Sequence, residues 1–308
     1  MAVVPKWRGR LEAFGRRHAW VGFPLAVVEK FGEDRAGALA AQIAYYAFFS
    51  VFPLLLVLGT TVGFVLHAEP SWQHAVQRSA VAQLPLVTSR DQPAPLHGNV
   101  LTLGVGLILA VWTGLAVVRA AQSAFDIVYD VDRRQRPGFL RTILRALGTL
   151  LIGGVGLIAT TLLSAAVTSA HTIGGVEVGI ALRIASAALA IVVDTALFVV
   201  VFRRLTVRDI AWRDALPGAA LASLVLQALQ LVATAFIDRR LAHVSSTYGR
   251  NAGTVIVMLS WFVLQAQVLL LAAEVNVVRQ DGLWDRPSHD VRPYPVENIV
   301  AMSRRGRS

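Results

Sequence analysis

The chain has 308 residues, of which 55% are hydrophobic and 16% are charged, and its mean hydropathy is +0.58. Soluble domains carry roughly 25% charged residues, so this composition excludes an ordinary water-soluble fold and favours an all-α integral membrane protein. The absence of cysteine excludes disulfides, thiolate metal sites and a thiol nucleophile. The formal net charge of +10 has to be interpreted from where the basic residues lie.

Residues 1–35 precede the first long apolar run and are predicted to form a cytoplasmic N-terminal segment. Within it, Pro24–Phe31 puts three apolar side chains on one side of a helix and Glu29 and Lys30 on the opposite side. Such a pattern is typical of an interfacial helix that lies on the membrane surface. An ordinary surface helix explains it equally well.

Six apolar runs are long enough to span a bilayer, whose hydrocarbon core needs roughly 20 helical residues. They predict a six-helix transmembrane domain over residues 36–278, followed by a cytoplasmic tail over 279–308 that we expect to be disordered. The six runs are Ala36–Leu66, Val100–Val118, Ile143–Ala170, Ile184–Phe202, Ala215–Ile237 and Ala252–Val278.

The basic residues predict the orientation of these spans. Alternate segments, including both termini, carry 23 of the 29 Lys and Arg, against 6 on the other side. Because basic loops stay on the cytoplasmic side, both termini are expected in the cytoplasm. The protein itself is expected in the bacterial inner membrane. The positive charge is thereby explained by topology and by contact with anionic membrane lipids, so no nucleic-acid partner is expected.

Asp194 lies near the middle of the fourth predicted span, where an ionisable group costs roughly 2.5–3.5 kcal/mol on insertion scales. Two interpretations stay open. The carboxylate could face an internal cavity as a proton or substrate site, or it could be protonated or bonded to a neighbouring helix.

Glu274 and Asn276 end the sixth predicted span, and Gln267 precedes Glu274 by seven residues on one face of the same helix. They are candidates for a polar substrate path, although Arg279 and the headgroup region could also satisfy Glu274. Amides at such positions more commonly bridge helices.

A second polar stripe lies at the start of the first span and adds further substrate-path candidates. Pro53 interrupts the same span and predicts a helix kink, because proline removes one backbone hydrogen bond. The stripe consists of Gln42, Tyr45, Tyr46 and Ser50.

No signature of a nucleotide-driven pump, a hydrolase or a metal centre stands in a plausible context, so we expect no cofactor, no metal and no catalysis. The acidic group Asp126, Asp130 and Asp132 could in principle hold catalytic metal ions. Its neighbours Arg133, Arg134 and Arg136 favour a solvated loop with mutual charge pairing instead.

Three stretches resemble the YihY/BrkB family of bacterial inner-membrane proteins: AAQIAYYAFFSVFPLLLVLG (40–59), AWRDALPGAA (from Ala211) and YGRNAGTVIVMLSWFVLQAQVLLLAAEVNVV (248–278). The chain differs from the family pattern at Asp126, where relatives usually carry Asn, and around Thr206, where a Pro is common. The matching motif positions are Ala44, Tyr45, Tyr46, Ser50, Pro53, Tyr248, Gly249, Trp261, Glu274 and Asn276.

The resemblance implies six spans with cytoplasmic termini, in agreement with the charge count. It implies no single activity, because members have carried ribonuclease and virulence labels, with envelope lipid handling as a further suggestion. We expect a transporter-like protein that moves an amphiphile such as a lipid. The alternatives are a non-transporting scaffold, with a homo-oligomer or an envelope protein as partner, and, less favoured, a membrane-bound ribonuclease.

Overall fold

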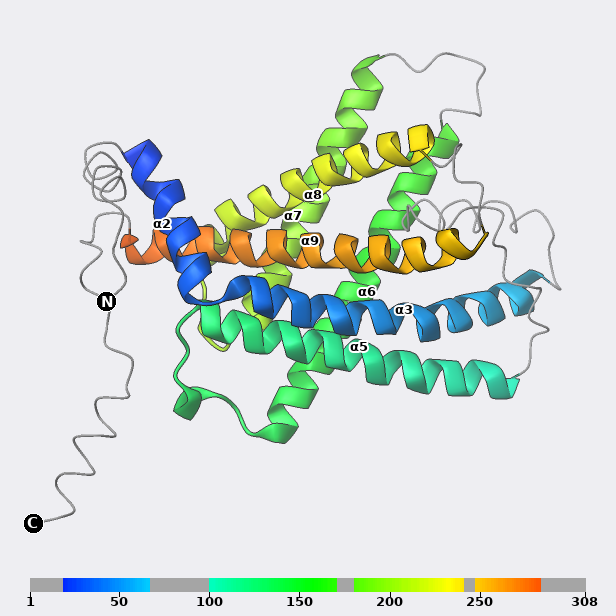
Figure 1. Cartoon of the computed structure of the whole chain (residues 1–308), viewed down its shortest axis with the longest axis horizontal. Helices are drawn as coiled ribbons and strands as arrows, with labels where there is room; N and C mark the ends of the chain where they lie inside the picture. Colours follow the sequence, from blue (N-terminus) through cyan, green and yellow to red (C-terminus); the bar gives the residue numbers. More distant parts are fainter. Residues whose placement is uncertain (1–18, 67–99, 171–179, 241–246, 284–308) are drawn as a thin grey trace, which may run out of the picture. The chain divides into compact units, whose positions relative to one another are not determined.

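The computed structural model describes residues 19–66, 100–170, 180–240 and 247–283, and these are helical apart from short turns. This confirms the predicted all-α class for the described residues (Figure 1). The elements are α2 (Ala19–Glu33), α3 (Ala36–Leu66), α5 (Val100–Val128), the short 3₁₀ helix η2 (Arg133–Gln135), α6 (Phe139–Ala170), α7 (Ile180–Leu205), α8 (Trp212–Arg240) and α9 (Thr247–Asp281).

Five helices contain a segment long and apolar enough to cross a membrane, among the residues described. The fourth predicted span lies in α7, which is not among them and which carries Asp194 and, in its last turn, Arg203 and Arg204. The count of six is therefore not confirmed. The five segments are Ala36–Thr61, Val100–Val128, Phe139–Gly156, Trp212–Ala233 and Val255–Asp281.

Helix α5 extends ten residues beyond the predicted end of the second span, from Val118 to Val128. This extension carries the polar residues Arg119, Gln122 and Asp126. In the structure Gln122 and Asp126 are buried, so this extension is covered by protein.

Residues 27–277 form one compact unit, which contains every interaction described below. The described residues at the chain ends, 19–26 and 278–283, group apart from it. The domain boundaries predicted at residues 35 and 278 stay predictions. Most of the tail predicted to be disordered, from residue 284, lies outside the described residues.

Small side chains line the helix contacts in this unit, where α5 packs against α3, α6 and α7, and α7 packs against α6 and α8. Ala40 and Ala44 on α3, and Ala120 and Ala124 on α5, are all buried. Small residues allow helix backbones to approach closely, which is how membrane helices associate without a hydrophobic driving force.

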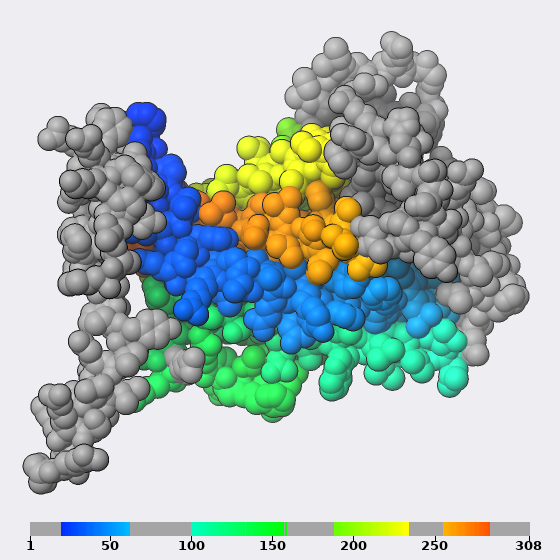
Figure 2. Space-filling view, viewed as in Figure 1, coloured from blue at the N-terminus to red at the C-terminus, as the bar shows by residue number. Residues whose placement is uncertain are grey.

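Large apolar side chains, by contrast, dominate the exposed surface, as expected for helices that face lipid. Phe52 on α3, Trp112 on α5 and Leu151 on α6 are each more than half exposed. Figure 2 shows one face of the molecule, to which α3 and α9 contribute. Pro53 lies inside α3, which stays helical to Leu66; the kink expected there remains a prediction.

Candidate functional site: a buried charged centre

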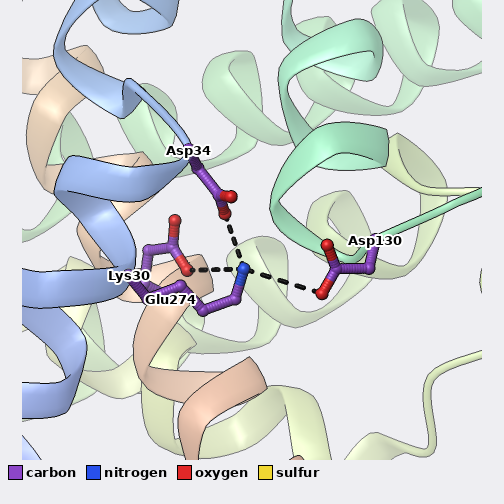
Figure 3. A network of polar contacts seen from close by, with 4 residues as sticks. All are labelled: Lys30, Asp34, Asp130 and Glu274. Atoms are coloured by element: carbon purple, nitrogen blue, oxygen red, sulfur yellow. Dashed lines mark hydrogen bonds and ion pairs between the residues drawn. The ribbon is translucent and has the colours of Figure 1, made fainter. Parts of the chain in front are cut away.

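Four charged side chains from separate parts of the chain converge in one centre, which Figure 3 shows. The Nζ atom of Lys30 lies 2.6 Å from Oδ2 of Asp34, 3.7 Å from Oε2 of Glu274 and 3.8 Å from Oδ2 of Asp130. We call these four residues the charged centre. One ammonium group thus faces three carboxylates.

Two tight turns place the acidic groups. Asp34 follows α2, and its amide donates to the carbonyl of Lys30 at 2.9 Å. Arg35 then adopts a left-handed backbone with φ 51°, and α3 begins at the next residue, Ala36. Asp130 follows α5 with φ 52°, and the amide of Val131 donates to the carbonyl of Asp126. Asp is among the residues that tolerate this conformation, so the chain can turn there without glycine.

The charged centre ranges from exposed to fully buried. Asp130 has 68% of its side chain exposed, Asp34 15%, Lys30 8% and Glu274 0%. Burial by itself would lower the pKa of Lys30, but the attraction of Glu274, Asp34 and Asp130 outweighs it and raises that pKa above its ordinary value. Lys30 is therefore charged at neutral pH.

The burial of Lys30 corrects the sequence interpretation, which placed this side chain on the polar face of an interfacial helix. Lys30 is 7% exposed and lies three residues after the buried Val27, on the same face of α2. Its ammonium also takes the role that sequence reasoning gave to Arg279 as counterion of Glu274. One sequence signal was available: only two of the 29 basic residues are Lys, Lys6 and Lys30.

Asn276 joins α8 and α9 next to the charged centre. Its Oδ1 accepts a hydrogen bond from the amide of Gly218 at 2.7 Å, and its Nδ2 donates to the carbonyl of Ala215 at 3.3 Å. Nδ2 also lies 3.5 Å from the hydroxyl of Tyr129. Asn276 thus bridges helices, the interpretation that sequence reasoning gave for amides.

Asp126 belongs to a second set of bonds, between the ends of α5, α6 and α7. Its Oδ1 accepts from the amide of Val207 at 3.0 Å and from the hydroxyl of Thr206 at 3.2 Å. Nearby, Arg145 donates to the carbonyl of Leu205 at 2.9 Å. The two positions at which the chain departs from the family pattern, 126 and 206, are therefore in contact with each other.

Two of the three carboxylates of the acidic loop cluster have partners outside the loop, whereas the expected pairing with Arg133 lies outside the described side chains. Asp126 points to Val207 and Asp130 to Lys30, while Oδ1 of Asp132 accepts from the backbone amide of Arg134 at 3.2 Å. Long-range partners take the first two carboxylates because α5 continues to Val128 and brings them against neighbouring helices.

Asp194 is half-buried in α7, and within the described residues no hydrogen bond or ion pair holds its carboxylate. The next residue, Thr195, lies with its hydroxyl 2.9 Å from that of Ser223 on α8. Polar groups of α7 and α8 therefore meet beside Asp194.

The structure brings Glu274 and Asn276 to the same buried end of α9 and distributes the other candidates elsewhere. Gln42 and Tyr45 are exposed on α3, and the hydroxyl of Ser50 donates to the carbonyl of Ala47 at 2.7 Å. Tyr46, Trp261 and Gln267 are partly exposed. Tyr248 and Gly249 lie in the first turn of α9, and their side chains are outside the described part.

The raised pKa of Lys30 predicts a loss of stability at alkaline pH. The ion pairs contribute fully below the ordinary lysine pKa of 10.5 and are lost as the pH rises through the higher folded value. Burial raises the pKa of Tyr129 to about 12, which adds a loss in the same direction. We expect the unfolding temperature in detergent to fall above about pH 10.5, and to fall less steeply for Lys30→Met.

Tyr129→Phe is the control for this pH series, because it removes the phenol but leaves the ion pairs of Lys30. A Lys30→Met variant that matches the wild-type slope would contradict the assignment.

The chain is similar to a known protein family and to two known bacterial proteins. A sequence model of the family described as "Virulence factor BrkB" matches residues 27–293. A ribonuclease-like protein, YfkH, of Bacillus subtilis is 23% identical over 253 residues, which cover 78% of this chain and 88% of that protein. A UPF0761 membrane protein of Methylibium petroleiphilum is 25% identical over 285 residues, which cover 87% of this chain and 65% of that protein. No solved structure matches significantly.

Proposed function

Because this chain belongs to the BrkB family, which includes membrane proteins, we propose that it helps an amphiphilic envelope component, such as a lipid, to cross the bacterial cytoplasmic membrane. The process is non-covalent, so it requires no catalytic group. A polar path has to accept the headgroup, while the acyl chains stay in contact with apolar side chains.

The proposed topology has six spans, with α7 as the fourth and both termini in the cytoplasm. The distribution of Lys and Arg supports it, because 23 of the 29 lie in segments that this topology puts inside. The charged centre and the bonds of Asp126 then lie near the cytoplasmic surface, beside the basic segments around Arg133 and Arg208.

The observation that carries the proposal is the half-buried carboxylate of Asp194 midway along α7, which has no partner among the described residues. A charged group at this depth is expensive unless it faces water, a polar partner or a ligand, and such groups in membrane helices commonly mark a transport path. The hydroxyl groups of Thr195 and of the buried Ser223 are further polar groups, at the contact of α7 with α8. Val192 on α7 and Leu224 on α8 are exposed and provide apolar surface on the same two helices for acyl chains.

The engagement of Asp126 and Asp130 is our reason to propose lipid passage rather than RNA hydrolysis. A metal-dependent nuclease needs several free carboxylates or histidines in one place. In the described residues, no group of three or more such side chains is arranged to hold a metal ion.

The test is lipid exchange in vesicles of phosphatidylcholine and phosphatidylethanolamine that contain a trace of fluorescent phospholipid. A quencher added outside the vesicles reaches only the label in the outer leaflet, which is about half of it, unless lipid crosses the bilayer. We expect the purified protein to let the quencher reach more than half of the label. Asp194→Asn should slow this exchange by about tenfold, which corresponds to about 1.4 kcal/mol on the barrier. Asp209→Asn is the matched control, because Asp209 is 99% exposed.

Wild-type vesicles that exchange lipid no faster than protein-free vesicles would disprove translocation and favour a scaffold. Equal rates for wild type and Asp194→Asn would remove Asp194 from the path.

A further inference from the structure

The charged centre has more negative than positive charge. Asp34, Asp130 and Glu274 face the single ammonium of Lys30, so full ionisation would leave a net charge of −2. Water can stabilise Asp130, which is 68% exposed, but it does not reach Glu274, which is 0% exposed. One further positive charge would therefore be strongly favoured at the buried side.

Of the three carboxylates, Glu274 has the weakest contacts that could stabilise a negative charge. Neither of its oxygens receives a hydrogen bond from the described residues, and its ammonium contact, at 3.7 Å, is longer than the 2.6 Å contact of Asp34. A buried carboxylate without donors bears the full cost of desolvation. The ammonium of Lys30 therefore compensates mainly the negative charge of Asp34. The carboxylate of Glu274 needs another positive charge to be neutralised.

A proton fits this place better than a metal ion. Lys30 Nζ already occupies the point at which the three carboxylates converge, and the described residues hold no arrangement suited to a metal. The carboxyl groups of Glu274 and Asp34 are also positioned for a side-chain hydrogen bond. Two carboxylates can form such a bond only when one of them carries a proton.

We propose that Glu274 is a proton-binding site of this protein, occupied in the folded structure and filled through the exposed Asp130 and the Lys30–Asp34 pair. The Glu274 O–H donates to Asp34, which accepts at the same time from the ammonium of Lys30. Deprotonation would leave the fully buried carboxylate of Glu274 and that of Asp34 to share one ammonium, so release of the proton is unfavourable while Lys30, Asp34 and Glu274 keep this arrangement. This inference does not depend on lipid passage.

Within the described residues, the other charged and titratable groups around the site are mostly acidic or neutral, and the one cation among them, Arg208, acts on Tyr129. Glu33, on the same helix as Lys30, adds negative charge. The pKa of Glu33 is raised, mainly by burial and to a lesser extent by the repulsion of Glu29. Directly after α5, Tyr129 faces the site, and burial raises its pKa to about 12, so the phenol is neutral. From α8, Asp214 adds negative charge near Tyr129.

The direct test is infrared spectroscopy of the full chain in vesicles of phosphatidylcholine. We expect a C=O stretching band of a protonated carboxylic acid at pH 7 that is absent in Glu274→Gln and present in Asp194→Asn. Persistence of the band in Glu274→Gln, or its absence in wild type at pH 7, would overturn the proposal.

Thermal unfolding is a second, independent readout. Glu274→Gln mimics the protonated acid in size and shape, so we expect an unfolding temperature at pH 7 close to that of wild type. Asp34→Asn, the matched control, should unfold at a clearly lower temperature, because it removes the charged partner of Lys30. Equal losses in both variants would show that Glu274 is ionised.

The route is tested by transferring the protein into D₂O and following the shift of the same band. Asp130→Asn should slow this exchange, whereas Asp132→Asn, two residues further along the chain, should leave it unchanged. Equal rates in all three proteins would remove Asp130 from the route. None of these measurements uses lipid transport, so their failure is distinguishable from failure of the proposed function.

Discussion

Replacing Lys30 by methionine should destabilise the protein by about 3–5 kcal/mol, the usual effect of removing one partner from a buried ion pair. Methionine keeps the length of the side chain but removes its charge. Asp34 would then lose its 2.6 Å contact with the ammonium while it remains 15% exposed, and Glu274 would lose the cation that lies nearest to it. The junction between α2 and α3 would keep the backbone bonds around Arg35 but lose this side-chain ion pair.

The measurement is the unfolding temperature in detergent at pH 7, followed by tryptophan fluorescence. Glu29→Gln is the matched control, because it removes a charge from the exposed side of the same helix one residue earlier. If the unfolding temperatures of Lys30→Met and Glu29→Gln were equal within experimental error, the ammonium would not be what stabilises the charged centre.

The pH dependence gives this prediction a second signature. Without Lys30 the carboxylates are uncompensated, and protonation relieves them as the pH falls toward the ordinary carboxyl pKa of about 4. The difference between Lys30→Met and wild type should therefore shrink on acidification. Adding Glu274→Gln to Lys30→Met should change stability little if Glu274 is already neutral, and should restore much of it if Glu274 is ionised.

Sequence periodicity was sufficient for the helices but not for their polar contacts. The first predicted span, Ala36–Leu66, has the same bounds as α3, and the third ends with α6 at Ala170. These bounds follow from local apolar runs, which one sequence displays directly. The fourth run, Ile184–Phe202, also lies within a helix, α7, but α7 is not among the membrane-crossing segments found in the described residues, where it carries Asp194, Arg203 and Arg204.

The charged centre could not be read from local pattern because its members are far apart in the chain. Lys30 and Asp34 have the (i, i+4) spacing of a helix pair, but Glu274 and Asp130 come from other elements. A helical projection assigns a long polar side chain to the solvent by default. The rarity of Lys in a chain that otherwise uses Arg was the one hint, since a compact ammonium fits between three carboxylates where a planar guanidinium does not.

Gly218→Ala should give the other large loss of stability, because α8 and α9 touch at this glycine. A Cβ placed there would overlap the backbone carbonyl of Ala272 and lie 2.6 Å from the side-chain oxygen and nitrogen of Asn276. Alanine is the better helix former by about 1 kcal/mol, so local propensity favours the change. The steric overlap outweighs this gain and makes the substitution destabilising. The helices have to separate, which stretches the 2.7 Å hydrogen bond from the Gly218 amide to Asn276.

The expected net loss is roughly 1–3 kcal/mol or more, as for other overpacked cores, again measured as unfolding temperature in detergent. Gly154→Ala on α6 is the matched control, because nothing lies within 4 Å of the place that its new methyl group would take, and it should be neutral or slightly stabilising. Truncating Asn276 to alanine in the Gly218→Ala background should not rescue the loss, since the carbonyl of Ala272 belongs to the backbone and cannot move aside. Rescue by that truncation would place the conflict in the side chain of Asn276 and leave the close approach of α8 and α9 unsupported.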